Sequence, residues 1–405
     1  MNSRRNVLKS LVTLPLVGGV LTQNKLLQSD SLGLLRSTTR DYFKELGIRT
    51  FINAAGTYTS MTGSLMAQEV VEAINYASHE YVNLDELHDK IGKRIAELLD
   101  CEAATVTSGC FGAMSIAMAG VMCGNDPEKV KQLPNTDGLK NEVIIQEAHS
   151  IGYSQALTNV GAKIVKIKTA KELESSINEK TAMLWFLNAN TEEGEIKWAE
   201  FIEIGKTFGV PTFIDCAADV PPVDNLFRFT KMGFDMVAFS GGKGLRGPQS
   251  AGLLLGKKEF IQYARLHTPP RGETIGRGMK VNKEEVVGLL AALELYLNKN
   301  HKKEWELWES QINLIANAAK SIAGVDIMIH VPPHANHVPS LKIKWDQNKI
   351  RVSPNQFREM LRNGEPSIET VGDDTEIGIT TWMMVPGQES IVADKIQMLL
   401  NNYSV

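Results

Sequence analysis

The sequence predicts an α/β protein with a mostly parallel central sheet covered by helices, followed by a smaller α+β domain. Two observations lead to this fold class. After about Gly47, short β-branched runs alternate with longer helical segments, and neither a long linker nor an internal repeat interrupts the alternation. The chain also has 405 residues, 43% of them hydrophobic, which is enough apolar material for a large and a small domain.

Seven short apolar runs are predicted as strands of a large domain that spans residues 31–282 and includes an N-terminal arm. Segments such as Trp198–Phe208, with apolar residues at spacings of three and four, are predicted as the helices between them. Strands this apolar are buried on both faces of a parallel sheet, and functional sites in such sheets lie at the carboxyl ends of the strands. The predicted strands are Ala103–Thr107, Glu142–Gln146, Lys163–Ile167, Ala182–Leu187, Thr212–Ile214, Met236–Phe239 and Ala251–Leu255.

The smaller domain is predicted for residues 283–405. It begins with a long amphipathic linking helix, Lys283–Leu297. Two strands, Leu341–Trp345 and Ile377–Thr381, and a last helix, Gln388–Leu400, complete it.

The N-terminal segment differs from the rest of the chain. Arg4, Arg5 and Lys9 precede an apolar run, Leu11–Leu21, which is typical of a twin-arginine export signal and too short for an ordinary transmembrane helix. A basic helix without a targeting role is the alternative. We expect residues 1–30 to direct the folded protein to the periplasm, with a cytoplasmic location if the signal does not function. No A-x-A motif follows, so cleavage stays open.

Charge and cysteine content exclude several classes of partner. The formal net charge is -4 and no long run of like charge occurs, so neither nucleic acid nor an acidic membrane surface is an expected partner. The cysteines, at positions 101, 110, 123 and 216, form no CxxC pair and have no histidine at ligand spacing. We therefore expect no metal site and no disulfide framework. Because nucleic acid and membranes are not expected partners, we expect a small-molecule substrate.

Lys243 carries the strongest chemical signal. It stands among glycines in the segment Ala238–Gln249, between two apolar strands. Glycines allow a close backbone approach to a ligand and positive φ, and a lysine at a strand end inside a pocket can lose its proton and form a Schiff base with a carbonyl. A phosphate-binding P-loop is excluded by the spacing. A solvated turn remains the alternative.

Asp215 ends another buried strand, twenty-eight residues before Lys243. An unpaired carboxylate would be costly there, so Asp215 needs a cationic partner. A protonated pyridine nitrogen is such a partner, and the acid would keep the ring an effective electron sink. A cap on the next turn or a pair with an arginine is the alternative.

Two further strand ends carry polar signals. Ser108, Gly109 and Cys110 open an apolar helix whose free amides suit a cofactor phosphate, although a plain glycine-rich cap has the same pattern. His149 follows the strand Glu142–Gln146, where its ring could stack on a pyridine ring or serve only the structure.

The order of these signals, anion site, histidine, aspartate and then lysine, is the order found in fold-type I enzymes that use pyridoxal 5'-phosphate (PLP). The segments Phe51–Thr57, Ser240–Gln249 and Ile275–Glu285 resemble the selenocysteine synthase-like family, and within it most strongly the D-glucosaminate-6-phosphate ammonia-lyase branch. The similarity runs from about Gly47 to the C-terminus.

The resemblance implies PLP as cofactor, Lys243 as the Schiff-base lysine and Asp215 as the partner of the pyridine nitrogen. It places Ser108, Gly109 and Cys110 at the phosphate and His149 on the ring. Ser240 is a further candidate at the phosphate and Asn190 at the ring edge, and Arg271 and Arg277 are candidates for a substrate carboxylate or phosphate, with surface salt bridges as the alternative.

The resemblance implies an enzyme. We expect neither a basic tRNA-binding face nor an added N-terminal RNA domain, and this argues against an aminoacyl-tRNA substrate. We expect a small amino acid or an amino-sugar acid, and an α,β-eliminating lyase that releases ammonia. Racemase, aldolase, aminotransferase and selenium-transferase-like chemistry remain alternatives. A binding protein that has lost catalysis is the non-enzyme alternative, and the presence of both Lys243 and Asp215 speaks against it. We expect a homodimer or a higher homo-oligomer, as is usual for this fold.

Overall fold

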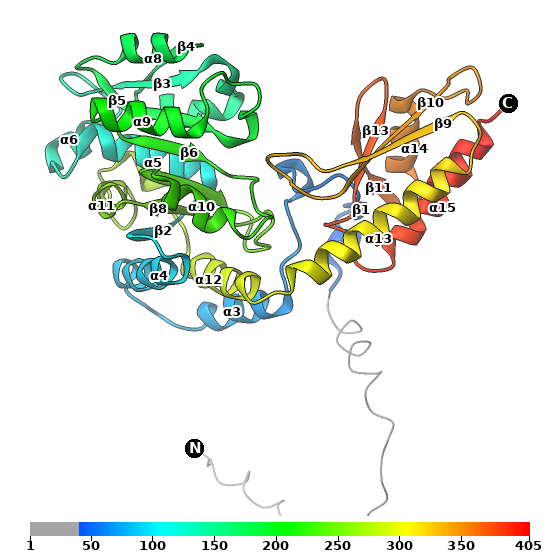
Figure 1. Cartoon of the computed structure of the whole chain (residues 1–405). Helices are drawn as coiled ribbons and strands as arrows, with labels where there is room; N and C mark the ends of the chain where they lie inside the picture. The colour runs from blue at the N-terminus through cyan, green and yellow to red at the C-terminus, as the bar shows by residue number, and fades with distance from the viewer. Residues whose placement is uncertain (1–39) are drawn as a thin grey trace, which may run out of the picture. The chain divides into compact units, whose positions relative to one another are not determined.

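The computed structural model describes residues 40–405 (Figure 1). The chain divides into two units, Met1–Thr50 and Phe51–Val405. In the first unit, the described residues form one short helix, α2 (Tyr42–Glu45), whose N-terminus is capped by Asp41. The expected export signal, residues 1–30, lies outside the described residues.

The second unit contains a seven-stranded sheet with the strand order β2-β8-β7-β6-β5-β3-β4. The neighbours from β7 to β4 pair in parallel, and β8 pairs antiparallel with both β2 and β7. All seven predicted strands are present, each within one residue of its predicted bounds, and the predicted fold class is confirmed. The strands are β2 (Ala103–Thr107), β3 (Glu142–Gln146), β4 (Lys163–Ile167), β5 (Thr181–Leu187), β6 (Thr212–Asp215), β7 (Met236–Ser240) and β8 (Gly252–Gly256).

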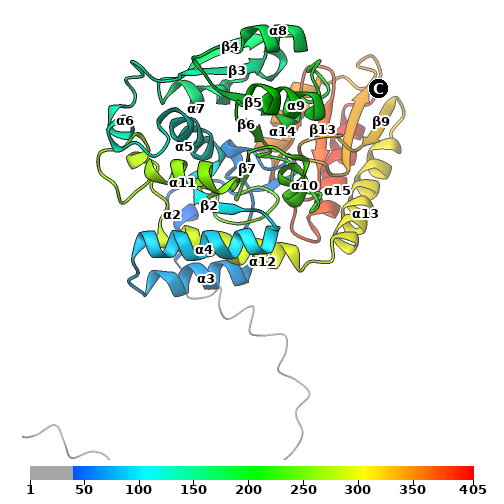
Figure 2. The same cartoon turned by 60° about the vertical axis from the view of Figure 1, so that its left-hand side comes forward.

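The sheet is buried on both faces because its strands are apolar on both faces. In β5, Leu184 and Phe186 pack into one core, and Met183 and Trp185 pack into the other. The first core also contains residues of α4, α9, α10 and α12, and the second contains residues of α5, α6, α7 and α11 (Figures 1 and 2). These helices are α4 (Leu84–Leu99), α5 (Gly109–Cys123), α6 (Pro127–Gln132), α7 (Gln155–Thr158), α9 (Trp198–Phe208), α10 (Asn225–Met232), α11 (Lys258–Leu266) and α12 (Lys283–Leu297).

The C-terminal part is an antiparallel sheet of four strands, ordered β12-β13-β10-β9, with a core of its own. Two long helices, α13 and α15, lie side by side against it (Figure 1). The predicted strands and last helix are present with small shifts, whereas β9, β12, α13 and α14 were not predicted. The elements are α13 (His301–Lys320), β9 (Val325–His330), β10 (Ser340–Trp345), α14 (Pro354–Asn363), β12 (Val371–Gly372), β13 (Ile377–Thr380) and α15 (Gln388–Asn402).

An N-terminal strand belongs to this C-terminal part. β1 (Phe51–Asn53) pairs in parallel with β11 (Ser367–Glu369), and Ile52 and Ile368 are buried in the C-terminal core. The N-terminal arm expected in the large domain therefore contributes a strand to the C-terminal part. The residues after β1 lie close both to Lys243 and to the C-terminal sheet. No helix among residues 40–405 is long and apolar enough to cross a membrane.

Candidate active site

Two cavities meet where the parallel strands of the large sheet end. The smaller, which we call the cofactor cavity, has a volume of about 300 Å³, and the second cavity has a volume of about 420 Å³. They share Thr59, Tyr153 and Lys243. Six of the residues predicted from the sequence line the cofactor cavity: Gly109, Cys110, Asn190, Asp215, Ser240 and Lys243.

Lys243 lies in the loop after β7 and is partly buried. It lines both cavities, and among residues 40–405 its ammonium group has no hydrogen-bond or ion-pair partner. A lysine on a cavity wall without a counter-ion is available for covalent chemistry. Its surroundings therefore suit the predicted Schiff base.

The glycines around Lys243 serve close packing of the loop. A Cβ on Gly242 would overlap the backbone of Gln249, and one on Gly244 would overlap the carbonyl of Val220. These glycines do not adopt positive φ, and the left-handed residue of the loop is Arg246, at φ 55°. The sequence argument from positive φ was thus wrong for this loop, because the glycines are needed for backbone-to-backbone contact.

Asp215 ends β6 and is only 4% exposed. Its Oδ1 accepts hydrogen bonds from the amide of Ala217 at 2.9 Å and from the thiol of Cys110 at 3.2 Å. Its Oδ2 has no hydrogen-bond partner within the described part of the chain. Burial raises the pKa of Asp215, while these hydrogen bonds and Lys243 lower it. A pyridinium N–H fits this site, because it would supply both a positive charge and a donor.

The N-terminus of α5 forms another wall of the cofactor cavity. Gly109 has φ 69°, and a Cβ on Gly252 would lie 2.6 Å from the carbonyl carbon of Gly109, so strand β8 approaches the helix start closely. Free amides at a helix start suit the predicted cofactor phosphate. Burial raises the pKa of the Cys110 thiol well above its usual range, which keeps it a neutral donor to Asp215.

Ser108 is the one predicted phosphate residue that lines neither cavity. Its hydroxyl packs against Gly112, makes no capping hydrogen bond and faces a separate small cavity beside His88. The side chain therefore points away from the other predicted phosphate residues, although its position in the sequence is next to theirs.

His149 is fully buried and lies outside the lining of both cavities. Its Nδ1 accepts a hydrogen bond from the amide of Leu187 at 3.2 Å, which leaves Nε2 to donate to the carbonyl of Asn190 at 3.1 Å. Burial lowers the pKa of His149 to about 4, so the ring is neutral. Its edge meets the ring of Phe186, at a centroid distance of 4.3 Å. In this structure the imidazole positions Asn190, whose amide group also donates to Ala148.

Neither predicted substrate arginine lines the two cavities. Arg271 contacts the carboxylate of Asp85 at 3.3 Å. Arg277 is exposed and has no ion pair with any residue between 40 and 405.

The sequence argument missed a second buried carboxyl group, Asp219. It lines the cofactor cavity and is 2% exposed. Its Oδ1 accepts hydrogen bonds from Asn188 Nδ2 at 2.6 Å and from the amide of Ala335 at 2.9 Å. Burial raises the pKa of Asp219 to about 6. Its place in the loop after β6, four residues beyond Asp215, was the one available signal.

Asp219 connects the large sheet to the loop after β9. The amide of Asn336 in that loop donates to the carbonyl of Ala218 at 2.7 Å, and both Ala335 and Asn336 have left-handed backbones, at φ 46° and 48°. Such backbones persist only where surrounding contacts hold them. The loop is thus held in place beside the cofactor cavity.

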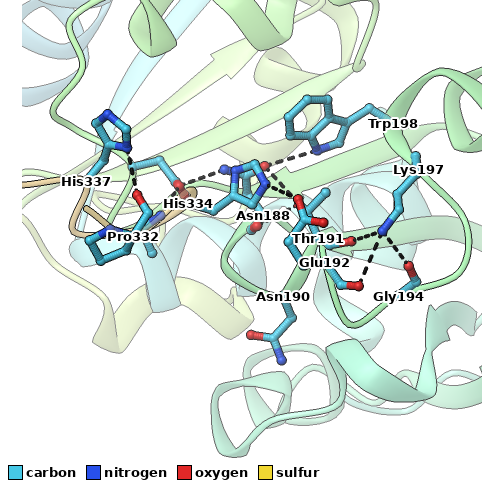
Figure 3. Close-up of polar contacts among 12 residues, drawn as sticks. Asn188, Asn190, Thr191, Glu192, Gly194, Lys197, Trp198, Pro332, His334 and His337 are labelled. Atoms are coloured by element: carbon cyan, nitrogen blue, oxygen red, sulfur yellow. Dashed lines mark hydrogen bonds and ion pairs between the residues drawn. The ribbon is translucent and has the colours of Figure 1, made fainter. Parts of the chain in front are cut away.

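Figure 3 shows the side chains that surround this junction. Trp198 Nε1 donates to Asn188 Oδ1 at 3.0 Å, and the ring of His334 meets Trp198 edge to face. His334 also contacts Glu192 at 3.0 Å, and Lys197 donates to the carbonyl of Thr191 at 2.6 Å. Residues 188–198 carry most of the side chains of this junction and include Asn190, which lines the cofactor cavity. One segment therefore supports both the loop after β9 and that cavity.

Comparisons with known proteins agree with this geometry. The family model of L-seryl-tRNA selenium transferase (SelA) matches residues 155–324. D-glucosaminate-6-phosphate ammonia lyase of Salmonella typhimurium is 27% identical over 341 residues, which cover 82% of this chain and 89% of the relative. A 5'-C-glycyluridine monooxygenase-decarboxylase of Streptomyces sp is 27% identical over 384 residues, which cover 90% of this chain and 94% of the relative.

A solved structure of D-glucosaminate-6-phosphate ammonia-lyase matches with a TM-score of 0.78 and 25% identity, and the match covers 90% of this chain and all of that one. The predicted resemblance and the predicted cofactor, PLP, are confirmed. The unpartnered lysine, the buried aspartate and the helix start fit that cofactor within one cavity. The chain thus has the fold of fold-type I PLP enzymes and is similar in sequence to the selenocysteine synthase-like family, whose model matches residues 155–324.

Proposed function

We propose that this enzyme is a lyase that releases ammonia from a small amino acid or an amino-sugar acid by α,β-elimination. One observation carries the proposal: Lys243, without a partner, and Asp215, with one free carboxylate oxygen, line the same cavity. The name of the Salmonella relative, an ammonia lyase similar over most of both chains, supports this reaction over the alternatives.

In the proposed reaction, PLP supplies an aldehyde that holds the substrate amine and a ring that accepts the electron pair left when the Cα–H bond breaks. The amine of Lys243, once free, takes the Cα proton as a general base. The β-hydroxyl group then leaves with a proton as water. The released enamine reacts with water to give a keto acid and ammonia, so the overall balance is amino acid to keto acid plus ammonia.

The other predicted residues take supporting roles in this proposal. Asp215 would keep a proton on the ring nitrogen, since its free Oδ2 could accept that N–H. The amides of Gly109 and Cys110, together with Ser240, bind the phosphate. Asn190, which lines the cofactor cavity and is positioned by His149, would lie at the ring edge. Of the two predicted substrate arginines, only Arg277 has no ion pair within residues 40–405, and neither lines the two cavities.

We also propose a homodimer. The described part of the chain exposes large apolar side chains on α3 (Gln68–Ser78) and in the segment after it: Val71 is 42% exposed, Tyr76 68% and Tyr81 fully exposed. Apolar groups gathered in this way mark an interaction surface. Sedimentation analysis of the holoenzyme is expected to give a dimer or a larger oligomer, and a monomer would contradict the proposal.

Residues 1–30 are proposed as a twin-arginine signal that places the enzyme in the periplasm. The sequence support is the order of Arg4, Arg5 and the apolar run Leu11–Leu21. Replacement of Arg4 and Arg5 by lysine is expected to leave the enzyme in the cytoplasm on cell fractionation. Unchanged location would contradict the signal.

The lyase proposal is tested by screening the holoenzyme for ammonia release against β-hydroxy amino acids and amino-sugar acids. We expect ammonia and a keto acid in equal amounts from at least one of them. A PLP-loaded enzyme that releases no ammonia but racemises, cleaves or transaminates these compounds would refute the lyase proposal.

A further inference from the structure

The second cavity adjoins the reacting amine of Lys243 but lies largely outside the residues assigned to the cofactor. Its walls come from the segment 55–59 after β1, from the C-terminal sheet and from the loop after β9. Because the two cavities share Lys243, a substrate whose Cα lies within reach of that amine would extend its remaining atoms into the second cavity. The chemistry of these walls therefore indicates what the substrate carries beyond its reacting carbons, which we call its tail.

Lys243 aside, the lysine on these walls shares its acid with a second lysine. Apart from Lys243, the lysine and the acid that line the second cavity are Lys342 and Glu376, with Nζ and Oε1 2.7 Å apart. Lys344 contacts the other oxygen of Glu376 at 2.9 Å. The hydrogen bond from Lys342 lowers the pKa of Glu376, which keeps the carboxylate ionised. No arginine of residues 40–405 lines this cavity.

This arrangement disfavours a phosphate group. A phosphate monoester carries about -1.5 to -2 charges at pH 7 and binds best where arginine or unpaired lysine side chains surround it. In the second cavity it would meet the carboxylate of Glu376, which already occupies Lys342 and Lys344. The phosphate and Glu376 would repel each other, and no arginine of residues 40–405 lines this cavity to hold the phosphate.

Uncharged polar groups dominate the remaining wall. Four buried polar atoms of lining residues have no hydrogen-bond partner within the described part of the chain: His330 Nδ1, Asn336 Oδ1, Thr380 Oγ1 and Trp382 Nε1. Such unpaired atoms are costly, and a ligand rich in hydroxyl groups offers both donors and acceptors to them without adding charge. Hydroxyl-bearing residues of the wall are Thr57, Tyr58, Thr59, Tyr153, Ser340 and Thr380.

Gly56 lies beside two of these unpaired atoms. It has φ 118°, and a Cβ built on it would lie 3.6 Å from Trp382 Nε1 and 3.9 Å from Thr380 Oγ1. Two of the unpaired polar atoms thus lie next to one residue without a side chain.

We propose that the second cavity binds an uncharged polyhydroxyl tail, so that the substrate is an amino-sugar acid without a terminal phosphate. This inference rests on the proposed ammonia-releasing function and narrows its substrate class. The substrate would differ from D-glucosaminate 6-phosphate, the compound in the name of the Salmonella relative, by loss of the phosphate.

The first test compares kcat/KM of the holoenzyme for D-glucosaminate and for its 6-phosphate by ammonia release. We expect the unphosphorylated compound to be preferred by about tenfold or more, the range that a few pocket contacts supply. Equal values, or a preference for the 6-phosphate, would overturn the inference.

A second test measures binding without reaction. Gluconate and 6-phosphogluconate lack the amine, so calorimetry on the holoenzyme reports tail recognition alone. We expect tighter binding of gluconate, and stronger binding of 6-phosphogluconate would overturn the inference even if ammonia were released from other amino acids. If no compound releases ammonia but gluconate binds preferentially, the lyase proposal fails and the tail assignment stands.

Two threonine variants form a matched pair. Thr380 and Thr370 are both buried with unpaired hydroxyl groups, but only Thr380 lines the second cavity. We expect Thr380→Val to weaken gluconate binding about tenfold, roughly the value of one lost hydrogen bond to a ligand, and Thr370→Val to leave it unchanged. Equal effects of both variants on binding would contradict the assignment. Thermal unfolding of both proteins checks that each is folded.

Discussion

The two cavities that meet at Lys243 are built differently. The cofactor cavity is formed mainly by loops that follow strands of one sheet, and it contains two buried carboxyl groups, Asp215 and Asp219. The second cavity combines the segment after β1 with the C-terminal sheet, and its acid, Glu376, is already paired with lysines. The reacting group thus lies on loops of the large sheet. The proposed substrate tail contacts the C-terminal sheet, which has its own hydrophobic core.

This difference leads to separable effects of mutation. Changes in the cofactor cavity are expected to lower kcat and to alter the colour of the holoenzyme. Changes in the second cavity are expected to act on substrate binding and to leave the cofactor in place.

The largest effect is expected for Lys243→Ala. The variant loses both the covalent attachment point and the proposed general base, so kcat is expected to fall by about a thousandfold or more. Steady-state ammonia release measures this. Activity within tenfold of the wild type would remove Lys243 from the proposed chemistry. Lys342→Ala, a change of lysine in the second cavity alone, serves as the control and is expected to act mainly on KM.

Asp215→Asn is expected to have the next largest effect. The amide keeps the shape but cannot stabilise a protonated ring nitrogen by charge, so kcat is expected to fall about a hundredfold while KM changes little. The visible spectrum of the holoenzyme should shift as well, because the protonation state of the ring changes. A variant with wild-type kcat and spectrum would show that Oδ2 of Asp215 has another role.

Asp219→Asn tests the role of Asp219, which links the large sheet to the loop after β9, through the pH dependence of the free energy of unfolding. The pKa of Asp219 rises from an ordinary 3.8 to about 6, so proton binding stabilises the native state fully below pH 3.8 and this contribution is lost as pH rises through about 6. The variant lacks this titration. Its free energy of unfolding relative to the wild type is therefore expected to rise by at most about 3 kcal/mol between about pH 4 and pH 8.

Denaturant unfolding across that pH range provides the measurement for Asp219. A difference between the two proteins that does not change with pH would mean that Asp219 keeps an ordinary pKa in the folded protein. The side-chain amide of the Asp219→Asn variant can still accept the hydrogen bond from the backbone amide of Ala335, so the loop after β9 is expected to stay in place. The fold-change in KM of this variant is expected to be smaller than the fold-change in kcat of Asp215→Asn.

The smallest effect is expected for Glu192→Gln at the edge of the same junction. The carboxylate that contacts His334 is 63% exposed, and exposed ion pairs contribute less than about 1 kcal/mol. Neither kcat nor KM should change. A loss of stability well above that value would show that the edge of the junction, and not Asp219, holds the loop.

The strand ends were predictable from the sequence, and the directions of the side chains were not. Asp215 and Lys243 stand directly after apolar runs, which places both at one edge of a parallel sheet. Ser108 and His149 stand at similar positions, yet packing against Gly112 and the hydrogen bond to Leu187 turn them away from the cavities. Such choices depend on neighbours distant in sequence.

The second cavity was not predictable because distant segments form it. β1 and β11 lie at opposite ends of the unit in sequence and pair only after folding, which brings Gly56 next to Thr380 and Trp382. The alternation of β9 is that of a half-exposed strand, so it lacked the continuous apolar run by which the large-sheet strands were recognised.

The central claim is that Lys243 carries the cofactor, and one measurement tests it directly. The holoenzyme is reduced with borohydride, which fixes a lysine–cofactor adduct, and the digested protein is mapped by mass spectrometry. The account predicts the pyridoxyl mass on the peptide that contains Lys243, and no such mass there in Lys243→Ala. An adduct on another lysine, or none in a protein saturated with PLP, would contradict it.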